Sequence, residues 1–443
     1  MNYFIQIFGC QMNRSDAERI AALFEANGLR PTDKMAKTDI AVVVMCSVRQ
    51  MAADRVFGLE QKFKQIKKTN PKFKSILTGC IVKNDKEKFS KIFDFVLNIK
   101  TLSQWQSVLR LDADPRMVST PANLQELNPR NADNDYFSVS PKQSSRFSAL
   151  IPISKGCDNF CTYCVVPYTR GPLESRPSQD ILKETQSAVN GGAKEIWLLG
   201  QNVNNYHYGQ IDFAKLLRSI NDIPGDFWIR FTSPHPKDFS TAAIKSMAQC
   251  QKITPYLNLP IQSGDNAVLK AMGRPYTVAA YKTLVKKIRA AFKKYRAGLE
   301  KEIAISTDVI VGFPGETKTQ FANTAKAFKA IKYDMAYISQ YSNRAGTAAA
   351  KLADNIAPAE KKRREEAIND IVKITALSHN KKYVGKTVVV LVDSVEKGIY
   401  GLGKTRSYKT VKFPLGGADI NPGDTVEVII EKAQSFGLAG KLQ

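Results

Sequence analysis

Residues 150–164, Leu-Ile-Pro-Ile-Ser-Lys-Gly-Cys-Asp-Asn-Phe-Cys-Thr-Tyr-Cys, carry the pattern that places this chain in a fold class. A short apolar strand, 150–154, leads into a glycine and then Cys157, Cys161 and Cys164, spaced C-x3-C-x2-C. Three thiolates on one tight loop can bind three irons of a four-iron cluster and leave the fourth iron open for a substrate. A zinc site would need a fourth nearby Cys or His, which the sequence lacks here. The loop therefore predicts an iron–sulfur cluster.

The sequence around this loop alternates apolar strands with helical segments. The six expected strands are 150–154, 195–199, 228–232, 256–260, 303–311 and 335–340. This alternation predicts a central partial (βα)6 TIM-like barrel over 143–379, with its chemistry at the C-terminal ends of the strands. Residues 358–380 are expected to form a connecting helix, on which the charged block 361–366 forms a solvated face.

The first part of the chain, 1–115, alternates in the same way, with a helix expected near 50–68, and predicts an open parallel α/β sheet. Cys10, Cys46 and Cys80 each follow an expected strand, 3–8, 40–44 or 75–78. Because the carboxyl ends of parallel strands share one edge, the three thiols should converge. They could hold a second cluster, with Gly9 and Gly79 leaving room for it, or be three buried thiols that cap strands. Residues 116–142 are expected to be a linker.

The last part, 380–443, changes to short β-branched runs separated by turns, which predicts a small five-stranded β-barrel. The formal net charge of the whole chain is +24, which suits a polyanion such as RNA, although a merely soluble basic protein would also carry such a charge. Seven cysteines, an odd number, and a start without a secretory pattern predict a reducing, cytoplasmic setting. Cys250 is expected to be an ordinary thiol at a helix end.

The cysteine loop resembles the signature of the radical S-adenosylmethionine (SAM) superfamily. Two further strings, Phe-Gly-Cys-Gln-Met-Asn at 8–13 and Val-Val-Pro-Tyr-Thr-Arg-Gly at 165–171, are similar to the methylthiotransferase family. Both strings resemble the MiaB-type branch of this family, the tRNA 2-methylthio-N6-isopentenyladenosine synthases. The similarity extends over nearly the whole chain. The family usually has Asn-Thr before its second N-terminal cysteine, whereas this chain has Val44 and Met45. The substitution removes two polar side chains beside the expected cluster and keeps the ligand.

This resemblance implies an enzyme with two [4Fe-4S] clusters and SAM, which acts on the anticodon stem-loop of tRNA. It also implies an electron donor such as flavodoxin or ferredoxin, and we expect a monomer. Three residues are singled out: Tyr163 as a neighbour of the SAM adenine, and Arg230 and Ser233 as lining of the cavity. Further SAM contacts are expected from residues just after strands: Gln201, Asn202, Gly312, Pro314, Gly315 and Glu316.

The C-terminal segment resembles a TRAM domain, an RNA-binding β-barrel. Its hairpin places cations around one aromatic ring, which suits phosphate contact and base stacking, while an exposed basic hairpin without that role is the alternative. The residues expected to contact RNA are Lys404, Arg406, Tyr408 and Lys409.

Two rival functions remain at this point. A related methylthiotransferase would act on threonylcarbamoyladenosine in tRNA or on a ribosomal protein, with the same fold and clusters. A non-enzymatic iron–sulfur protein that binds RNA or senses redox state would not need the loop at 157–164. Of the three histidines, His235 follows the third barrel strand and is the one considered as a site residue.

Overall fold

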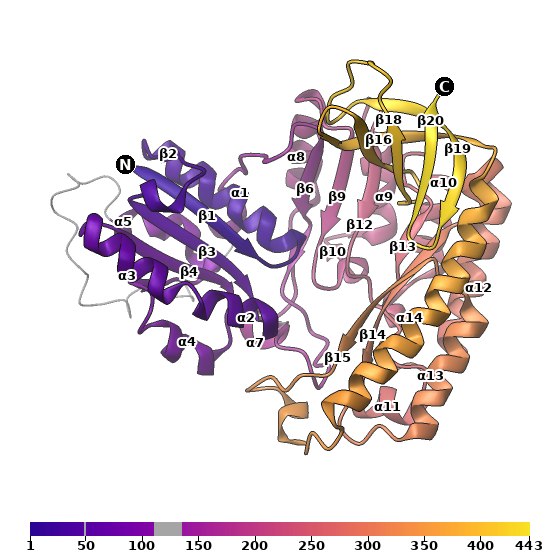
Figure 1. Ribbon diagram of the computed structural model, residues 1–443, viewed down its shortest axis with the longest axis horizontal. Helices are drawn as coiled ribbons and strands as arrows, with labels where there is room; N and C mark the ends of the chain where they lie inside the picture. Colours follow the sequence, from indigo (N-terminus) through magenta and orange to yellow (C-terminus); the bar gives the residue numbers. More distant parts are fainter. Residues whose placement is uncertain (48–49, 110–134) are drawn as a thin grey trace. The chain divides into compact units, whose positions relative to one another are not determined.

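The computed structural model describes residues 1–47, 50–109 and 135–443 (Figure 1). Its contacts divide the chain into two compact units. Unit 1 comprises residues 1–144, 164–172 and 344–347, and unit 2 comprises residues 145–163, 173–343 and 348–443. Most of the expected linker lies outside the described residues. Its described end belongs to unit 1 instead, because Tyr136 on α6 (Asp135–Ser138) packs into the core of that unit.

Unit 1 is an open α/β sheet whose paired strands all run parallel, as predicted. The central strand is β-branched and wholly apolar, and six of its seven residues are buried, as expected for a parallel strand covered on both faces. The strand order is β2-β1-β3-β4-β5, with bounds Arg30–Pro31, Asn2–Phe8, Ile40–Cys46, Lys74–Cys80 and Phe95–Val96.

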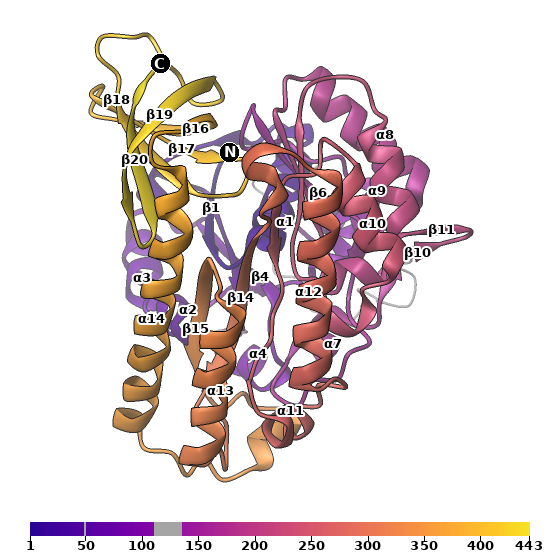
Figure 2. The ribbon, with the colours of Figure 1, turned by 90° about the vertical axis from the view of Figure 1, so that its right-hand side faces the viewer.

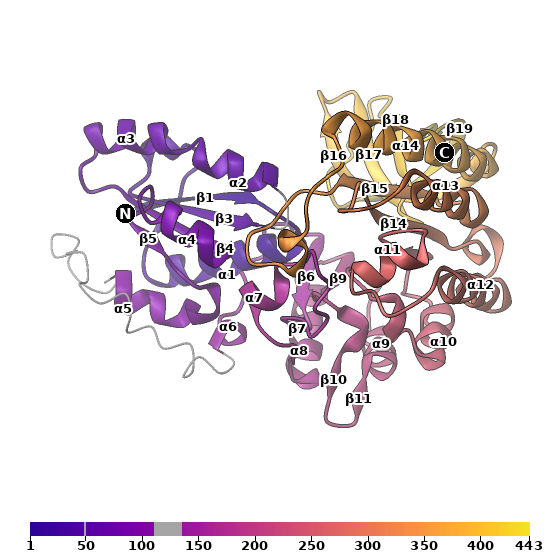
Figure 3. The same cartoon turned by 90° about the horizontal axis from the view of Figure 1, so that it is seen from below.

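Helices lie against both faces of this sheet (Figure 3), and each face has its own apolar core. Helix α1 (Gln11–Ala26) contributes Ile20 and Phe24 to one core. On the other face, the single helix expected over 50–68 is two helices, α2 (Gln50–Phe57) and α3 (Glu60–Thr69), interrupted at Gly58. Helix α4 (Lys83–Phe89) completes that second core through Phe89, and α5 (Trp105–Leu109) joins the first through Trp105.

Unit 2 begins with the partial barrel, whose strands lie within two residues of the predicted ends. They form two parallel three-stranded sheets, β6-β9-β12 and β13-β14-β15, which a parallel bridge between Ile229 and Ile253 joins. The strands are β6 (Ser148–Pro152), β9 (Glu195–Leu199), β12 (Trp228–Phe231), β13 (Tyr256–Asn258), β14 (Ala304–Val311) and β15 (Met335–Gln340).

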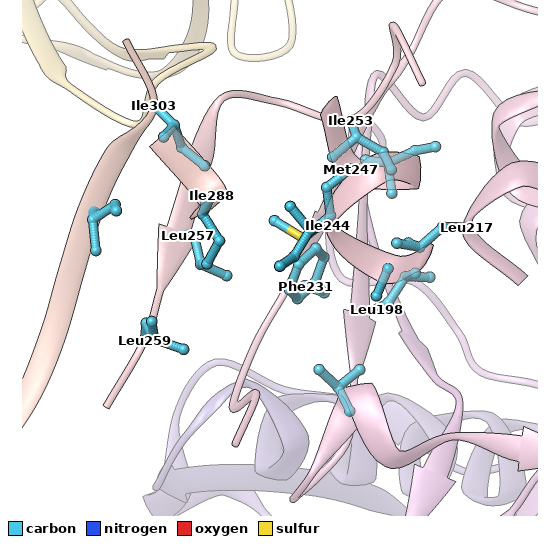
Figure 4. Packing of buried hydrophobic residues seen from close by; sticks show 14 of the residues in the cluster. Leu198, Leu217, Phe231, Ile244, Met247, Ile253, Leu257, Leu259, Ile288 and Ile303 are labelled. Atoms are coloured by element: carbon cyan, nitrogen blue, oxygen red, sulfur yellow. The ribbon is translucent and has the colours of Figure 1, made fainter. Parts of the chain in front are cut away.

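Helices cover the outer face of these strands, with α12, α13 and α14 side by side in Figure 2. Apolar residues from strands and helices meet in one core, as Leu198, Phe231 and Met247 do in Figure 4. The helices are α8 (Ser178–Asn190), α9 (Phe213–Asn221), α10 (Thr241–Gln249), α11 (Asn266–Ala271), α12 (Val278–Tyr295), α13 (Lys318–Ile331) and α14 (Pro358–Asn380). Among the described residues, no helix is both long and apolar enough to cross a membrane.

Helix α14 has the predicted bounds, but its charged block is not a solvated face throughout. Lys361 and Arg364 are only 6% and 3% exposed, because both side chains turn toward the barrel. Arg364 forms an ion pair with the buried Glu316, and Lys361 with Asp354. A charge run on a helix therefore includes two buried positions that the pattern alone did not distinguish.

The chain ends in a closed five-stranded barrel, as the sequence predicts. Its strand order is β16-β17-β18-β20-β19, and its interior is filled by Val390, Val411 and Phe413, each fully buried. The strands are β16 (Thr387–Glu396), β17 (Tyr400–Thr405), β18 (Thr410–Pro414), β19 (Thr425–Gln434) and β20 (Gly437–Leu442).

Candidate iron–sulfur and SAM site

The three N-terminal cysteines converge at the carboxyl edge of the unit 1 sheet, as expected. Cys46 and Cys80 end the adjacent strands β3 and β4 and lie directly opposite each other in register. Cys10 follows β1, the other neighbour of β3, and caps helix α1. The three thiols lie close enough together that hydrogen bonding with Cys46 shifts their pKa values. We call these three residues the auxiliary cysteine edge.

Hydrogen bonding sets the ionisation of these thiols. The bond from Cys46 lowers the pKa of Cys10 to about 6 and that of Cys80 to about 7. The pKa of Cys46 is raised, first because of its bonds to those two sulfurs and also because it is buried. Two of the three groups are thus disposed to be thiolates near neutral pH, which is the form that binds metal.

The surroundings of this edge differ from the prediction in two respects. Gly79, with φ +107°, leaves room for the backbone of Met45, and Gly9 leaves room for the Asn13 side chain, so neither glycine is explained by a cluster alone. Val44 and Met45 are both fully buried, one in each core of unit 1. Their apolar side chains therefore pack inside the sheet layers, while the Met45 carbonyl accepts a hydrogen bond from Asn13.

Unit 2 holds the first two cysteines of the barrel loop, 156–164. Cys157 and Cys161 are each 7% exposed. Cys157 Sγ accepts the Asn159 N–H at 3.4 Å, and Cys161 Sγ accepts from Arg274 Nη1 at 3.5 Å. Burial raises the pKa of Cys157. Cys164 is partly buried and begins the segment 164–172, which by its contacts belongs to unit 1.

The barrel loop is anchored from the side of helix α11. The Thr162 N–H donates to Met272 and its hydroxyl to Ala271, both backbone carbonyls, at 3.0 and 2.8 Å. Tyr163, expected to lie beside the SAM adenine, packs partly buried against an apolar cluster that includes Met272 and Phe313. The loop therefore keeps its cysteines in place through contacts that do not depend on a bound metal.

Buried polar atoms without a hydrogen-bond partner gather after the barrel strands, on the edge where chemistry is expected. Among the described residues they include Ser154 Oγ after β6, Gln201 Oε1 and Asn202 Oδ1 after β9, His235 Nε2 after β12, Glu316 Oε1 after β14 and Tyr341 Oη after β15. An unpaired buried polar group is costly, so such a concentration is typical of a site that a polar ligand completes. These hydroxyl, amide, carboxylate and imidazole atoms could form hydrogen bonds with SAM, which carries amino, carboxylate and ribose hydroxyl groups.

The loop expected to contact SAM after β14 is partly closed on itself. Glu316 is buried and accepts the Gly312 N–H at 2.7 Å and an Arg364 N–H at 2.8 Å with the same oxygen. Burial raises the pKa of this carboxyl. Gly315 adopts φ +79° and Pro314 is buried beside it, so this segment is first of all a tight turn. One Glu316 oxygen remains for a ligand.

His235, the histidine considered as a site residue from the sequence, is buried after β12. Its Nδ1 accepts the Lys237 N–H at 3.2 Å, so Nε2 carries the proton in the neutral ring and points to no acceptor among the described residues. Burial, together with the charges of Arg274 and Lys237, lowers its pKa to about 2. Asn204 holds its backbone through two hydrogen bonds of 2.7 and 3.0 Å. The ring of Tyr276 lies edge-on at 5.8 Å.

Arg230, expected in the SAM cavity, lies elsewhere. Its guanidinium donates to Glu195, to Thr254 and to two carbonyls of the last barrel, those of Thr405 and Arg406, and it is 2% exposed. These contacts do not support SAM binding by Arg230. Through these hydrogen bonds Arg230 holds the turn after β17 against the partial barrel. Ser233 lies just after β12, on the side of the barrel where the chemistry is expected. It has φ +55°, and its carbonyl accepts the Val203 N–H.

The residues predicted to bind RNA lie at the end of β17 and in the turn after it, and their side chains are engaged within unit 2. The Tyr408 ring lies tilted against the Tyr256 ring, with centroids 4.5 Å apart, and edge-on to Trp197 at 5.4 Å, and burial raises the pKa of Tyr408 to about 12. The cationic partners are as follows: Lys409 pairs with Asp334, Arg406 with Glu300, and Lys404 donates to Thr410 and lies over the Tyr408 ring. Their direct contact with RNA therefore stays a prediction that this packing does not favour.

Two buried arginines contact cysteine sulfurs, and spacing arguments did not find them. Arg274 follows α11, far in sequence from the loop it contacts. Arg170 bonds to Cys80, and its only sequence signal is membership of the string at 165–171. The pair Val48 and Arg49, which follows Cys46 and Ser47, lies outside the described residues.

Family models match the chain in three places. The Radical SAM superfamily covers residues 151–328, the Uncharacterized protein family UPF0004 covers residues 2–99, and the TRAM domain covers residues 381–442. The solved structure of the radical S-adenosylmethionine methyltransferase TsrM from Kitasatospora setae shares the fold. It has a TM-score of 0.56 and 13% identity, covering 79% of this chain and 77% of its own. Fold and cysteine loop together define a radical SAM enzyme, a class that uses a [4Fe-4S] cluster and SAM.

Curated relatives narrow this class. A tRNA-2-methylthio-N(6)-dimethylallyladenosine synthase of Clostridium novyi is 37% identical over 99% of this chain and 96% of its own length. A protein of the same name from Dictyoglomus thermophilum is also 37% identical, over 99% of this chain and 98% of its own. The chain belongs to the family of tRNA-2-methylthio-N(6)-dimethylallyladenosine synthases.

Proposed function

We propose that this chain adds a methylthio group to C2 of N6-isopentenyladenosine next to the anticodon of tRNA. The observation that carries the proposal is the identity of 37% over 99% of the chain with synthases of that modification. The adenine C2–H has no useful acidity, so base catalysis fails and radical chemistry is required. The cysteine loop of a radical SAM enzyme meets that requirement.

We assign Cys157, Cys161 and Cys164 to one [4Fe-4S] cluster and the auxiliary cysteine edge to a second. No three His, Cys, Asp or Glu side chains in the described ranges are arranged around a single metal ion. A four-iron cluster does not need that arrangement, because each thiolate binds a different iron. The auxiliary cysteine edge fits this requirement, since it offers sulfurs from three neighbouring strands and a buried, unpartnered Ser47 hydroxyl beside them. When bound, the clusters supply the electron that cleaves SAM and the place where sulfur is held.

In this proposal the side chains of the protein bind SAM, orient a cluster ligand and exclude water from the site. Gln201, Asn202 and Glu316 offer unpaired acceptor oxygens to the amino and hydroxyl groups of SAM, and His235 offers an N–H donor to a carboxylate or ring nitrogen. Burial of Cys157 and Cys161 keeps bulk water from the first cluster. Arg274 directs an N–H at the Cys161 sulfur and so orients that ligand.

The partners follow from the same proposal. The net charge of +24 and the TRAM barrel support binding of the anticodon stem-loop, with the target adenosine unstacked. We further propose a monomer that works in the cytoplasm, with flavodoxin or ferredoxin as the electron donor.

The test is mass spectrometry of tRNA nucleosides from a strain that lacks the gene. We expect 2-methylthio-isopentenyladenosine to vanish and the unmethylthiolated nucleoside to accumulate. Wild type and the Cys250→Ala variant should restore it, and Cys157→Ala should not. Cys250 is the matched control because it is also 7% exposed but lies at the end of α10, away from both cysteine sets.

Two results would reject the assignment. If the nucleoside persists while methylthiolation of a ribosomal protein or of threonylcarbamoyladenosine is lost, the substrate is wrong. If Cys157→Ala still forms 5′-deoxyadenosine under anaerobic reducing conditions, the mechanism is wrong. Reconstituted protein should bind about eight irons per chain.

A further inference from the structure

Arg170 is a buried cation directed at a cysteine sulfur within unit 1. It ends the short helix α7 (Val166–Arg170) and is only 3% exposed. Its Nε donates to Cys80 Sγ at 3.0 Å, while Nη1 and Nη2 donate to the two oxygens of Asp16 at 3.2 and 2.5 Å. The planar fork of an arginine fits this combination, because its N–H groups have fixed directions.

Asp16 is itself held from two further sides. It is fully buried on α1, and its oxygens accept the Tyr136 hydroxyl at 2.8 Å and the Asn13 amide at 3.3 Å. The Asn13 oxygen in turn accepts the Cys10 N–H at 3.3 Å. The network therefore reaches two ligands of the auxiliary cysteine edge, Cys80 through Arg170 and Cys10 through Asn13.

Stability alone is a poor explanation for this buried ion pair. Taking an arginine and an aspartate out of water costs several kcal/mol per ion, and well-packed apolar residues commonly stabilise a core as well or better. The salt bridge also needs only the two terminal nitrogens of Arg170, yet Nε is placed against a thiol. A donor to a sulfur is what the ligand of a metal cluster requires in its surroundings.

We propose that Arg170, fixed by Asp16, is a positioning residue for the auxiliary cluster, to whose Cys80 ligand it donates an N–H···S hydrogen bond. The inference rests on the second cluster of the proposed function. The bond orients the Cys80 sulfur and draws electron density from it. It thereby stabilises the reduced form of the cluster and slows the loss of iron.

The experiment uses the full chain with Cys157→Ala, Cys161→Ala and Cys164→Ala, in which only the auxiliary cluster can form. Into this reference we introduce Arg170→Gln. We expect iron to pass to a chelator about 10- to 100-fold faster than in the reference, the loss typical when the partner of a metal ligand is removed. The reduction potential, followed by electron paramagnetic resonance, should become more negative.

Two further variants separate a role at the sulfur from a role in folding. Arg170→Lys keeps the charge but cannot make the fork, so its iron-release rate should lie between those of the reference and Arg170→Gln. Tyr136→Phe removes another hydrogen bond of Asp16 and leaves all three bonds of Arg170 in place. It should lower the unfolding midpoint while release rate and potential stay at the reference values.

The outcomes are distinguishable. If the reference chain binds no iron, the second cluster of the proposed function fails, and this inference fails with it. If the reference binds about four irons but Arg170→Gln changes neither the release rate nor the potential, this inference alone is overturned. It is also overturned if Tyr136→Phe reproduces the effects of Arg170→Gln, because the network would then act only through packing.

Discussion

Replacement of Arg230 by Met tests whether this arginine joins the two barrels of unit 2 or binds SAM. Methionine keeps much of the aliphatic volume but donates no hydrogen bond. The variant loses the pair with Glu195 and the bonds to the Thr405 and Arg406 carbonyls, each of the latter 2.9 Å long. Arg230 is 2% exposed, so water does not replace these partners.

The magnitude follows from the buried carboxylate that remains. The Glu195 side chain is 10% exposed, and breaking a buried ion pair by removing one partner costs about 3–5 kcal/mol. We expect about 3 kcal/mol, the lower end, because Glu195 keeps donors from Trp197 and Ser148. For a unit of this size, with an unfolding entropy of about 2.1 cal/mol/K per residue, that loss lowers Tm by about 5 °C.

Calorimetry measures the unfolding of the variant, and titration calorimetry measures its affinity for SAM below that temperature. We expect a lower Tm with SAM affinity unchanged. Adding Glu195→Gln should recover part of the loss, because the unpaired charge is then removed. A variant with unchanged Tm and at least a tenfold loss of SAM affinity, about 1.4 kcal/mol, would refute the structural role and restore the sequence prediction.

Two smaller changes test other features. Gly79→Ala should destabilise the chain by more than about 1 kcal/mol in urea unfolding, because a side chain at φ +107° would fall onto the Met45 backbone; an unchanged midpoint would contradict this. The His235 pKa falls to about 2 on folding, so stability is full above its ordinary pKa of 6.5 and declines as pH falls below it. His235→Asn, which keeps an acceptor for the Lys237 N–H, should remove about 2 kcal/mol of the stability loss between pH 6.5 and 5; equal slopes for both proteins would disprove the burial of a neutral ring.

Local pattern predicted most of the fold. Strand β3 is a run of β-branched and apolar residues, which is typical of a parallel strand buried on both faces. The position of Cys46 and Cys80 at strand ends then predicted their meeting, since neighbouring parallel strands end at the same edge. The prediction of one helix near 50–68 was wrong in one respect, because the structure has two helices there. A single glycine, Gly58, within a periodic segment does not reveal that the helix ends at that point.

The partners of charged side chains could not be predicted in this way. Lys409 and Arg406 look like an exposed basic hairpin in the sequence, yet Asp334 and Glu300, which neutralise them, are 75 and 106 residues away. Lys361 and Arg364 also look solvated in the sequence, yet they are buried and paired with Asp354 and Glu316. A pattern of charges records that a segment is polar but not what lies against it.

The sequence by itself determined the elements, their order and the six cysteines that end strands or share one loop, because these depend on periodicity and spacing along the chain. Only the tertiary structure decided that Arg170 lies against Cys80 and that Arg230 supports the last barrel instead of lining the SAM cavity. The physical reason is that a buried charge is tolerated only where folding brings its partner to it, and the carboxylates that pair with Arg170 and Arg230 are 154 and 35 residues distant in the chain.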